Sequence, residues 1–288
     1  MIQNSYEKSD ISVFGSSGFI GGNFCRLFSD VCVKIDRESR VPLTNNVLYF
    51  ISTTDNFNIF EDPQKDINTN LKILVDTLQN CKELGITFNF ISSWYVYGNT
   101  VLPASESSTC SPKGFYSITK KCAEDLLVNF CETFGIKYRI LRLSNVYGIG
   151  DMNASKKKNA LQFLTTRLIN NKPIHLYDGG KFTRDYMHVN DTCQAINKVL
   201  REGDINTVYN IGSGIEYQFK DLIEIVSEHV GSSSSIELKP TPEIYKNLQV
   251  DNMCLDVKKL GDLGFKCSVT INDGIKDMCD KLQGAIDD

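Results

Sequence analysis

The sequence has few of the features on which membrane, metal and disulfide proteins depend. No apolar run approaches the roughly 18 residues that a membrane-spanning helix needs, and the opening MIQNSYEKSD has no apolar core of a secretory signal. Only three His are present, and the ten Cys are scattered without a C-x-x-C pair, which argues against a metal site. We therefore predict a cytoplasmic protein with reduced cysteines, no metal and no membrane partner.

Charge and length exclude further classes of protein. The formal net charge is -4 at pH 7, so a basic surface for nucleic acid is not expected. The chain has 288 residues, of which 41% are hydrophobic, and this is enough for one large domain or two modest ones with a sizeable core. These values are typical of a globular enzyme that acts on a small molecule.

A glycine-rich turn follows the first predicted strand. Residues 11–14 read as a short buried strand, 15–21 read G-x-x-G-x-x-G, and a helical pattern follows from 22 to 28. Glycine permits a tight turn and lets backbone N–H groups approach a diphosphate at a helix N-terminus. The pattern predicts a dinucleotide site. Its expected contacts are Gly15, Ser17, Gly18, Phe19, Ile20 and Gly21.

The next two predicted strands supply further candidate cofactor contacts. The strand at 31–35 ends at Asp36, and an acidic residue about 20 residues after the glycines typically binds the adenosine ribose. Its charge favours NAD over NADP, while Arg37 is either a cofactor contact or a solvated loop charge. Only residues 38–46 precede the strand at 47–51, so the third strand region of a Rossmann sheet should be shortened. Ser52 and Thr53 follow at a strand end, where ligands bind in open α/β sheets.

Two stretches supply candidate catalytic groups. Tyr116 and Lys120 are four residues apart in a predicted helix at 114–134, so their side chains share one face. A nearby ammonium favours the phenolate, and the pair can then exchange protons near neutral pH where a lone tyrosine cannot. Ser93 follows the predicted strand at 86–91, where a hydroxyl is well placed to touch a ligand.

Taken together, these segments resemble the extended short-chain dehydrogenases/reductases, specifically the nucleotide-sugar epimerases and dehydratases. The matching segments are Gly15, Gly18 and Gly21, Asp36, Asn70, Ser92–Gly98, Tyr116 with Lys120, Leu141–Gly148, Arg184–Asp191 and Tyr209–Gly214. The resemblance implies a Rossmann-type doubly wound parallel sheet in an α/β protein with a smaller α/β substrate-binding domain. It implies an NAD-binding domain at 1–148 plus 184–212, a nucleotide-sugar-binding domain at 149–183 plus 213–288, and a homodimer.

The resemblance also implies roles for single residues. Tyr116 would take the hydroxyl proton at C4 of a nucleotide-linked hexose, Lys120 would lower the Tyr116 pKa and hold the nicotinamide ribose, and Ser93 would orient the reacting oxygen. Asn145 would contact the sugar nucleotide, and Arg184 would bind its diphosphate. Two aromatic residues have two readings each. Trp94 lines the sugar pocket or packs in the core, and Tyr177 stacks on the nucleobase or is a surface residue.

The outcome of the reaction stays open at this point. Family 4,6-dehydratases carry Asp-Glu directly after the catalytic Ser or Thr, and Trp94-Tyr95 cannot replace that pair, so a dehydratase is disfavoured. The leading prediction is a 4-epimerase that keeps its NAD. A 4-keto reductase or 4-dehydrogenase is the alternative, and a non-catalytic NAD-sensing protein is least favoured.

Two details of substrate binding are also open. The family's second diphosphate-binding Arg has no match, and Lys246 is the nearest candidate. The lysine run at 156–158 is either a solvated face or a contact for an anionic substrate.

Overall fold

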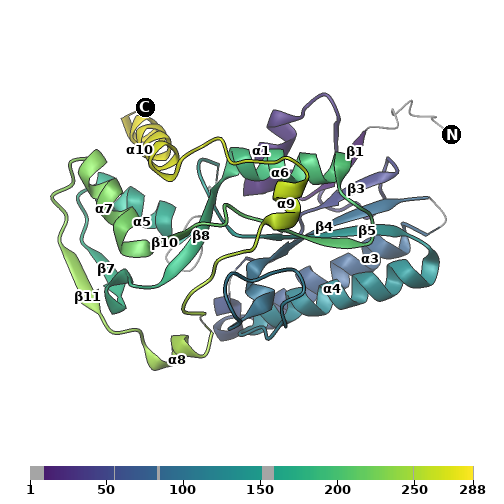
Figure 1. Cartoon of the computed structure of the whole chain (residues 1–288), viewed down its shortest axis with the longest axis horizontal. Coiled ribbons are helices and arrows are strands. Elements are labelled where there is room, and N and C mark those ends of the chain that lie inside the picture. The colour runs from purple at the N-terminus through teal and green to yellow at the C-terminus, as the bar shows by residue number, and fades with distance from the viewer. Residues whose placement is uncertain (1–9, 55, 83–84, 151–158, 249, 288) are drawn as a thin grey trace.

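The computed structural model describes residues 10–54, 56–82, 85–150, 159–248 and 250–287. These residues form two α/β parts that lie side by side (Figure 1). The larger part contains a six-stranded sheet, and the smaller part contains a three-stranded and a two-stranded sheet.

The six-stranded sheet is entirely parallel and runs in the order β2-β1-β3-β4-β5-β9. Its strands are β1 (Ile11–Phe14), β2 (Cys32–Lys34), β3 (Asn46–Tyr49), β4 (Thr87–Ser93), β5 (Lys137–Leu143) and β9 (Thr207–Ile211). The order reverses between β1 and β3. Open α/β sheets bind their ligands at the carboxyl ends of the strands at such a reversal.

The third strand region is shortened, as predicted. In the described part of the chain, β2 is the strand at one edge of this sheet, and the segment that runs from β2 to β3 along the chain contains no further strand. The short connection is tied to β1 instead, because the Ser12 backbone N–H donates to Thr44 Oγ1 at 2.9 Å. The Leu43 N–H in turn donates to Ser12 Oγ at 2.9 Å.

Helices cover both faces of this sheet (Figure 1). On one face lie α1 (Phe19–Leu27) and α6 (Val189–Glu202), and on the other lie α3 (Ile73–Gln79) and α4 (Phe115–Phe134). Each face has its own apolar core, one including Phe24 and Ile196 and the other Phe88 and Leu127. The doubly wound parallel sheet that the family resemblance implied is thereby confirmed.

The helix expected at 66–84 is shorter than predicted and is interrupted. It consists of α2 (Gln64–Asp66), a π-helical stretch η2 (Ile67–Lys72) and α3, and it ends at Gln79. Asn80 then bonds its side-chain amide to the Asp76 carbonyl at 2.8 Å, and such local bonds compete with helix continuation. The π-helical stretch includes the buried Asn70, and π-bulges are frequent at functional sites.

The smaller part has a core of its own. Its sheets are β10-β8-β6 and β11-β7. Their strands are β6 (Asn145–Tyr147), β7 (Ile174–Tyr177), β8 (Thr183–His188), β10 (Glu216–Gln218) and β11 (Ile236–Lys239). The accompanying helices are α5 (Ala160–Ile169), α7 (Phe219–His229), α8 (Glu243–Lys246) and α10 (Ile271–Asp287). Residues such as Leu164, Leu222 and Met278 form one cluster between α5, α7 and α10.

Short helical segments follow strand ends within each part. The 3-10 turns η1 (Asn56–Phe60) and η3 (Trp94–Tyr97) follow the ends of β3 and β4, and η4 (Asp178–Gly180) follows β7. Helix α9 (Lys258–Asp262) returns to the larger part, where Leu260 joins the core beside β9.

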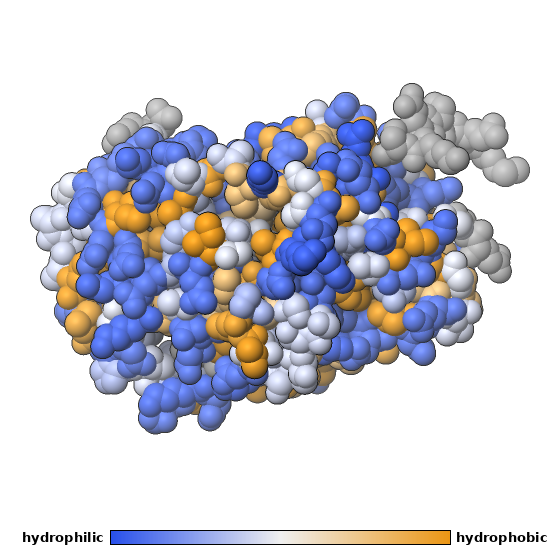
Figure 2. Space-filling model, viewed as in Figure 1, coloured by the Kyte–Doolittle hydropathy of each residue, from blue (hydrophilic) through white to orange (hydrophobic). Residues whose placement is uncertain are grey.

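The surface and the cysteines are ordinary. The face seen in Figure 2 is a mosaic in which hydrophobic residues form small groups among hydrophilic ones. All ten cysteines lie in the described part of the chain, and none is in a disulfide. Across the described residues, no helix combines the length and the apolar character that crossing a bilayer requires.

Candidate active site

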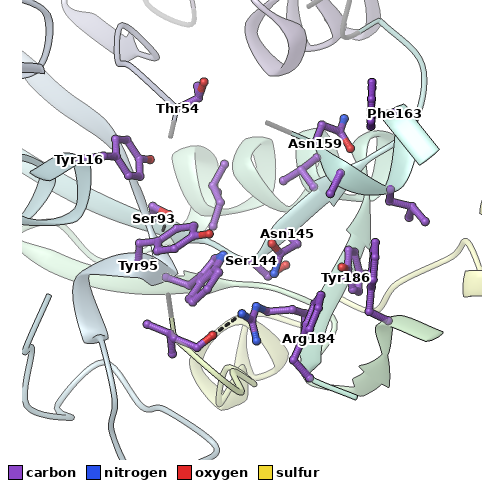
Figure 3. A pocket seen from close by; sticks show the side chains of 18 of the residues that line it. Thr54, Ser93, Tyr95, Tyr116, Ser144, Asn145, Asn159, Phe163, Arg184 and Tyr186 are labelled. Carbon is purple, nitrogen blue, oxygen red and sulfur yellow. Dashed lines mark hydrogen bonds between the residues drawn. The ribbon is translucent and has the colours of Figure 1, made fainter. Parts of the chain in front are cut away.

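A cavity of about 780 Å³ lies at the carboxyl ends of β1, β3, β4 and β5. One side is formed by the glycine turn, the residues after β3 and β4, and the first turns of α4. The other side comes from α5, β7, β8 and the segment 250–252 of the smaller part. Figure 3 shows Tyr116, Ser93 and Tyr95 facing Tyr186, Asn159 and Phe163 across this space.

The glycine turn leaves the start of α1 open to the cavity. Gly15 has φ 78°, in the left-handed region, and its carbonyl accepts from the Gly18 N–H at 3.1 Å. A Cβ atom on Gly21 would lie 2.4 Å from that carbonyl oxygen. Gly18 precedes α1, and no side chain caps the first N–H groups of the helix. Such a turn is suited to a diphosphate, and Gly15, Gly18, Phe19, Ile20 and Gly21 all line the cavity.

Three predicted cofactor residues lie outside this lining. Ser17 is exposed and lines a neighbouring cavity beside Arg26. Asp36 and Arg37 are exposed just after the edge strand β2. One Asp36 oxygen accepts from the Glu38 N–H at 2.9 Å. Ser17 belongs to the glycine turn and shares that neighbouring cavity with Gly18 and Phe19, and the roles of all three residues stay predictions.

The end of β3 is tied to the catalytic helix through Asn70. Asn70 Oδ1 accepts from Ser52 Oγ at 3.0 Å and from the Thr53 N–H at 2.8 Å. Its Nδ2 donates to Thr119 Oγ1 at 2.9 Å. Ser52 and Thr53, both predicted cofactor contacts, line the cavity and are thereby held beside α4.

Ser93 and Tyr116 lie together on the cavity wall. Ser93 is the last residue of β4, and its Oγ accepts from the Tyr95 N–H at 3.3 Å at the start of η3. Tyr116 is in the first turn of α4. Burial raises the pKa of Tyr116, while hydrogen bonding with Ser93 and Ser52 opposes that increase. The two predicted reactive hydroxyls are therefore within one hydrogen-bonding group.

Lys120 lies one turn further along α4 and is only 2% exposed. Its Nζ donates to the Ile91 carbonyl at 2.7 Å and lies 4.0 Å from the centre of the Phe90 ring. Burial lowers the pKa of Lys120 to about 7, and the negative charge of Glu124 acts in the opposite direction. The lysine can therefore change charge near neutral pH, and only its ammonium form favours the Tyr116 phenolate.

Two aromatic side chains follow Ser93. Trp94 is buried and packs with Val250 and Met253, yet it also lines the cavity, so both of its predicted readings apply. The Tyr95 ring stacks on Trp94, with ring centres 3.8 Å apart. Tyr95 also meets Tyr116 edge-on at 5.9 Å.

The predicted substrate contacts lie on the side of the smaller part. Asn145 lines the cavity and donates from Nδ2 to the Asp185 carbonyl at 3.2 Å. Tyr177 also lines it, is 36% exposed and lies edge-on to Tyr245, with ring centres 6.3 Å apart.

Arg184 lines the cavity but is engaged with backbone carbonyls. It is 9% exposed, and Nη1 donates to the Thr183 carbonyl at 2.8 Å. Its guanidinium also donates to the carbonyls of Val250 and Asp251, and Figure 3 marks one hydrogen bond of Arg184 with a dashed line. The group is held between the rings of Trp94 and Phe182, at 5.1 and 4.8 Å. A diphosphate at Arg184 would therefore compete with these carbonyls.

The other candidate for a diphosphate contact is not at the cavity. Lys246 is exposed, does not line the cavity and pairs with Glu243 at 2.5 Å. Lys181, which the sequence did not single out, lines it instead. The lysine run at 156–158 lies outside the described residues.

Several lining residues were missed at the sequence level. Ser144 follows β5 directly, and strand ends are where ligands bind in such sheets, so that position carried a signal. Tyr186 lies two residues after Arg184 on β8 and therefore on the same face of the strand. Asn159 and Phe163, which come from the start of α5, had no such signal.

Comparison with known proteins gives a consistent result. The sequence model of the NAD dependent epimerase/dehydratase family matches residues 46–212. A candidate UDP-glucose 4-epimerase of Methanocaldococcus jannaschii is 30% identical over 254 residues, which cover 86% of this chain and 76% of that protein.

Two solved structures have the same fold. The UDP-glucose 4-epimerase of Thermotoga maritima with UDP-glucose has a TM-score of 0.86 at 22% identity, covering 96% of this chain and 99% of that one. The UDP-glucuronic acid 4-epimerase of Bacillus cereus, with UDP-glucuronic acid and NAD, has the same score, identity and coverage. The family match spans more than half of this chain, and the resemblance seen in its motifs is confirmed. The chain belongs to the NAD dependent epimerase/dehydratase family.

Proposed function

We propose that the protein catalyses NAD-dependent oxidation and reduction at C4 of a nucleotide-linked sugar, as a nucleotide-sugar 4-epimerase. The observation that carries this proposal is that Ser93, Tyr116 and Lys120 line one cavity with the glycine turn and Arg184. A relative and several structural neighbours are named 4-epimerases of UDP-sugars, which supports the same substrate class here.

The residues present fit a dinucleotide. The glycine turn and the uncapped start of α1 would hold the diphosphate. Asp36, with Ser17 and Arg37, would hold the adenosine side, and Ser52, Thr53 and Lys120 the nicotinamide side. Bound there, NAD would supply the two-electron oxidant of the first half-reaction and, once reduced, the reductant of the second.

The protein's own groups would move and steady the proton. Tyr116 as phenolate would take the proton of the C4 hydroxyl during oxidation and return it to the oxygen after reduction. Ser93 would hydrogen-bond that oxygen in both half-reactions, and the charge of Lys120 would stabilise the phenolate. The keto sugar must present both faces between the two half-reactions, so it must turn while the nucleotide stays bound.

Binding of the nucleotide would supply that anchor. Arg184 offers a planar fork suited to a diphosphate, and Lys181 adds a second positive charge to the lining. Asn145 and Trp94 would contact the sugar, and Tyr177 would stack on the base. Remote binding energy of this kind positions the reacting carbon.

The proposed organisation follows from the same elements. An NAD-binding domain at 1–148 plus 184–212 and a substrate domain at 149–183 plus 213–288 are supported by the pairing of β9 with β5 and by the separate core around α5, α7 and α10. The bounds do not follow the sheets everywhere, because β6 and β8 pair in the smaller part and α9 packs on the larger one. Exposed apolar residues on α4 (Ile118, Leu126 and Phe134) support a homodimer through this helix. We propose a cytoplasmic location, in keeping with ten unpaired cysteines.

A substrate panel tests the proposal. Purified protein is incubated with NAD and UDP-, dTDP-, CDP- and GDP-linked hexoses in turn, and the products are separated by chromatography. We expect one nucleotide class to give the C4 epimer with no net change in NADH. Release of a keto sugar with equimolar NADH would favour a 4-dehydrogenase, or a 4-keto reductase running in reverse.

A further inference from the structure

A buried ion pair anchors the catalytic helix to the sheet. Glu124 lies one turn after Lys120 on α4 and is 2% exposed. Its Oε1 accepts from Ser92 Oγ at 2.5 Å and from Arg142 Nε at 3.0 Å, and its Oε2 accepts from Arg142 Nη2 at 2.7 Å. Two-point contact with a guanidinium fixes the carboxylate in one orientation.

The partners of Glu124 come from the strands that present the reactive serine. Ser92 on β4 and Arg142 on β5 lie opposite each other in the sheet, and Ser93 follows Ser92 directly. The three residues before Ser93 all contact α4, through the Phe90 ring, the Ile91 carbonyl and the Ser92 hydroxyl. The position of Ser93 relative to Tyr116 is therefore set by the contacts that hold Lys120 and Glu124.

Without Glu124, the buried positive charges of Lys120 and Arg142 would have no negative partner in the contacts described here. Lys120 and Arg142 are both buried, and Glu124 is the anion that lies one helical turn from Lys120 on α4 and pairs with Arg142. A buried cation without an anion is costly. Ionisable groups on the elements packed around Lys120 include Tyr116 on α4, Tyr95 and Tyr97 in η3, and Asp66 in α2.

We propose that Glu124 is a positioning residue for the Tyr116–Lys120 pair: its carboxylate keeps Lys120 in the ammonium form, and its bonds to Ser92 and Arg142 hold α4 in register with the end of β4. The inference rests on the proposed function, in which Tyr116 and Lys120 act on the substrate. Glu124 itself acts only through Lys120 and the sheet.

The electrostatics of the site agree with this geometry. Burial lowers the pKa of Lys120 to about 7, and Glu124 is the charge that raises it. Removing the carboxylate lowers this pKa further, so Lys120 loses its proton at a lower pH. A neutral lysine no longer favours the Tyr116 phenolate. Activity should therefore be lost from the alkaline side of the pH profile.

Three variants distinguish a positioning role of Glu124 from a role in the stability of the fold alone. Glu124→Gln removes the charge and keeps the shape. Glu124→Leu combined with Arg142→Met removes the whole ion pair, so no unpaired buried charge remains. Asp125→Asn is the matched control, because Asp125 is the next residue of α4 and its i,i+4 pair with Lys121 is exposed. Thermal unfolding establishes first which variants are folded.

The direct readout is the ionisation of Lys120, which is monitored through the carbon-13 NMR signal of its Cε atom. The Lys120→Met variant identifies this signal, because the signal is missing from its spectrum. We expect Lys120 in the double variant to titrate roughly one pH unit below the parent, and at least as far below in Glu124→Gln. Turnover should fall about tenfold at neutral pH, with its alkaline limb displaced by the same interval. Asp125→Asn should match the parent in both measurements.

A folded double variant whose Lys120 titrates as in the parent, and whose turnover is unchanged, would overturn the inference and leave Glu124 as a structural ion pair. If Glu124→Gln does not fold, the double variant decides. The NMR titration needs no substrate. A parent protein that converts no nucleotide sugar would therefore count against the proposed function and not against the role of Glu124.

Discussion

At the residue scale, the site depends on burying groups that are usually ionised in water. Lys120, Glu124 and Arg142 are all buried beside the cavity, and Lys120 has a pKa lowered to about 7. A lysine in a cavity whose pKa is brought close to 7 by burial and by one specific anion is typical of a functional site. Burial of Lys120 lowers the free energy of unfolding of the protein, and it provides a side chain that can change charge near neutral pH.

Replacing Tyr116 by phenylalanine should abolish most turnover and leave the fold intact. The change removes only the hydroxyl that exchanges the proton, and such groups contribute about 10²–10⁴-fold to rate. Steady-state kinetics with the identified nucleotide sugar measures the loss, and calorimetric titration with NAD should show unchanged affinity. Tyr138→Phe on β5, outside the cavity lining, is the control. A Tyr116→Phe enzyme with parental turnover would exclude Tyr116 as the acid–base group.

Lys120→Met should change how stability depends on pH. The folded-state pKa of Lys120, about 7, is below the unfolded value of about 10.4. Between these values the unfolded chain holds a proton that the folded protein has lost, so the parent gains stability as pH rises through this window, by a few kcal/mol at most. The methionine variant lacks this gain and should be the more stable protein near neutral pH.

Urea denaturation at several pH values between 7 and 10 measures this effect as a difference between parent and variant. Lys121→Met, which changes a neighbouring lysine paired with Asp125 at the surface, should keep the parental slope. If the free energy of unfolding changes with pH equally in Lys120→Met and in the parent, the pKa of Lys120 in the folded protein is not lowered towards 7.

At the scale of elements, the glycine turn and α1 form the part most open to direct test. Gly21→Ala places a Cβ 2.4 Å from the Gly15 carbonyl oxygen, so backbone must move and the turn must open. We expect NAD affinity to fall at least about tenfold and stability to fall by about 1–3 kcal/mol. Gly22→Ala is the matched control, since its Cβ would meet the nearest atom at an ordinary 3.5 Å. Calorimetric NAD titration of both variants decides, and equal affinities would contradict the assigned role of the turn.

The elements also show what local sequence can and cannot predict. Strands β1, β3, β4 and β5 were predictable because most of their positions are apolar and buried, although Ser12, Asn89 and Arg142 are buried polar residues within them. The early end of α3 was not, because it depends on one side-chain bond at Asn80. Helix α10 was also missed. Its buried positions, Ile275, Met278 and Cys279, have helical spacing but lie in an otherwise polar segment.

At the scale of the whole molecule, Asp191 joins the two parts. This buried residue of α6 accepts from the Ser268 and Val269 N–H groups at 2.9 Å each and from Ser268 Oγ at 2.6 Å. These bonds hold the segment that leads into α10. Asp191→Asn turns one acceptor into a donor and should cost about 1–3 kcal/mol in urea denaturation. Asp273→Asn, at an exposed partner of Thr270, should cost less, and equal losses would refute the special role of Asp191.

The packing of the two parts against each other explains which residues of the site could be predicted from the sequence. Tyr116 and Lys120 share one helix face through their spacing, whereas the place of Ser93 beside them was implied by the family resemblance. Tyr186, Asn159 and Phe163 reach the cavity only because the smaller part packs against the strand ends. The carbonyls that hold Arg184 come from residues 250 and 251, far along the chain, and no local pattern announces them.

The most direct test of the account follows a label at the reacting carbon. The identified nucleotide sugar is prepared with deuterium at C4 and converted by the purified protein in ordinary water, and the product is analysed by mass spectrometry and NMR. We predict the C4 epimer with deuterium retained at C4, because the same hydrogen leaves and returns within one closed site. An epimer carrying protium at C4, or a keto sugar as the final product, would contradict the central claim.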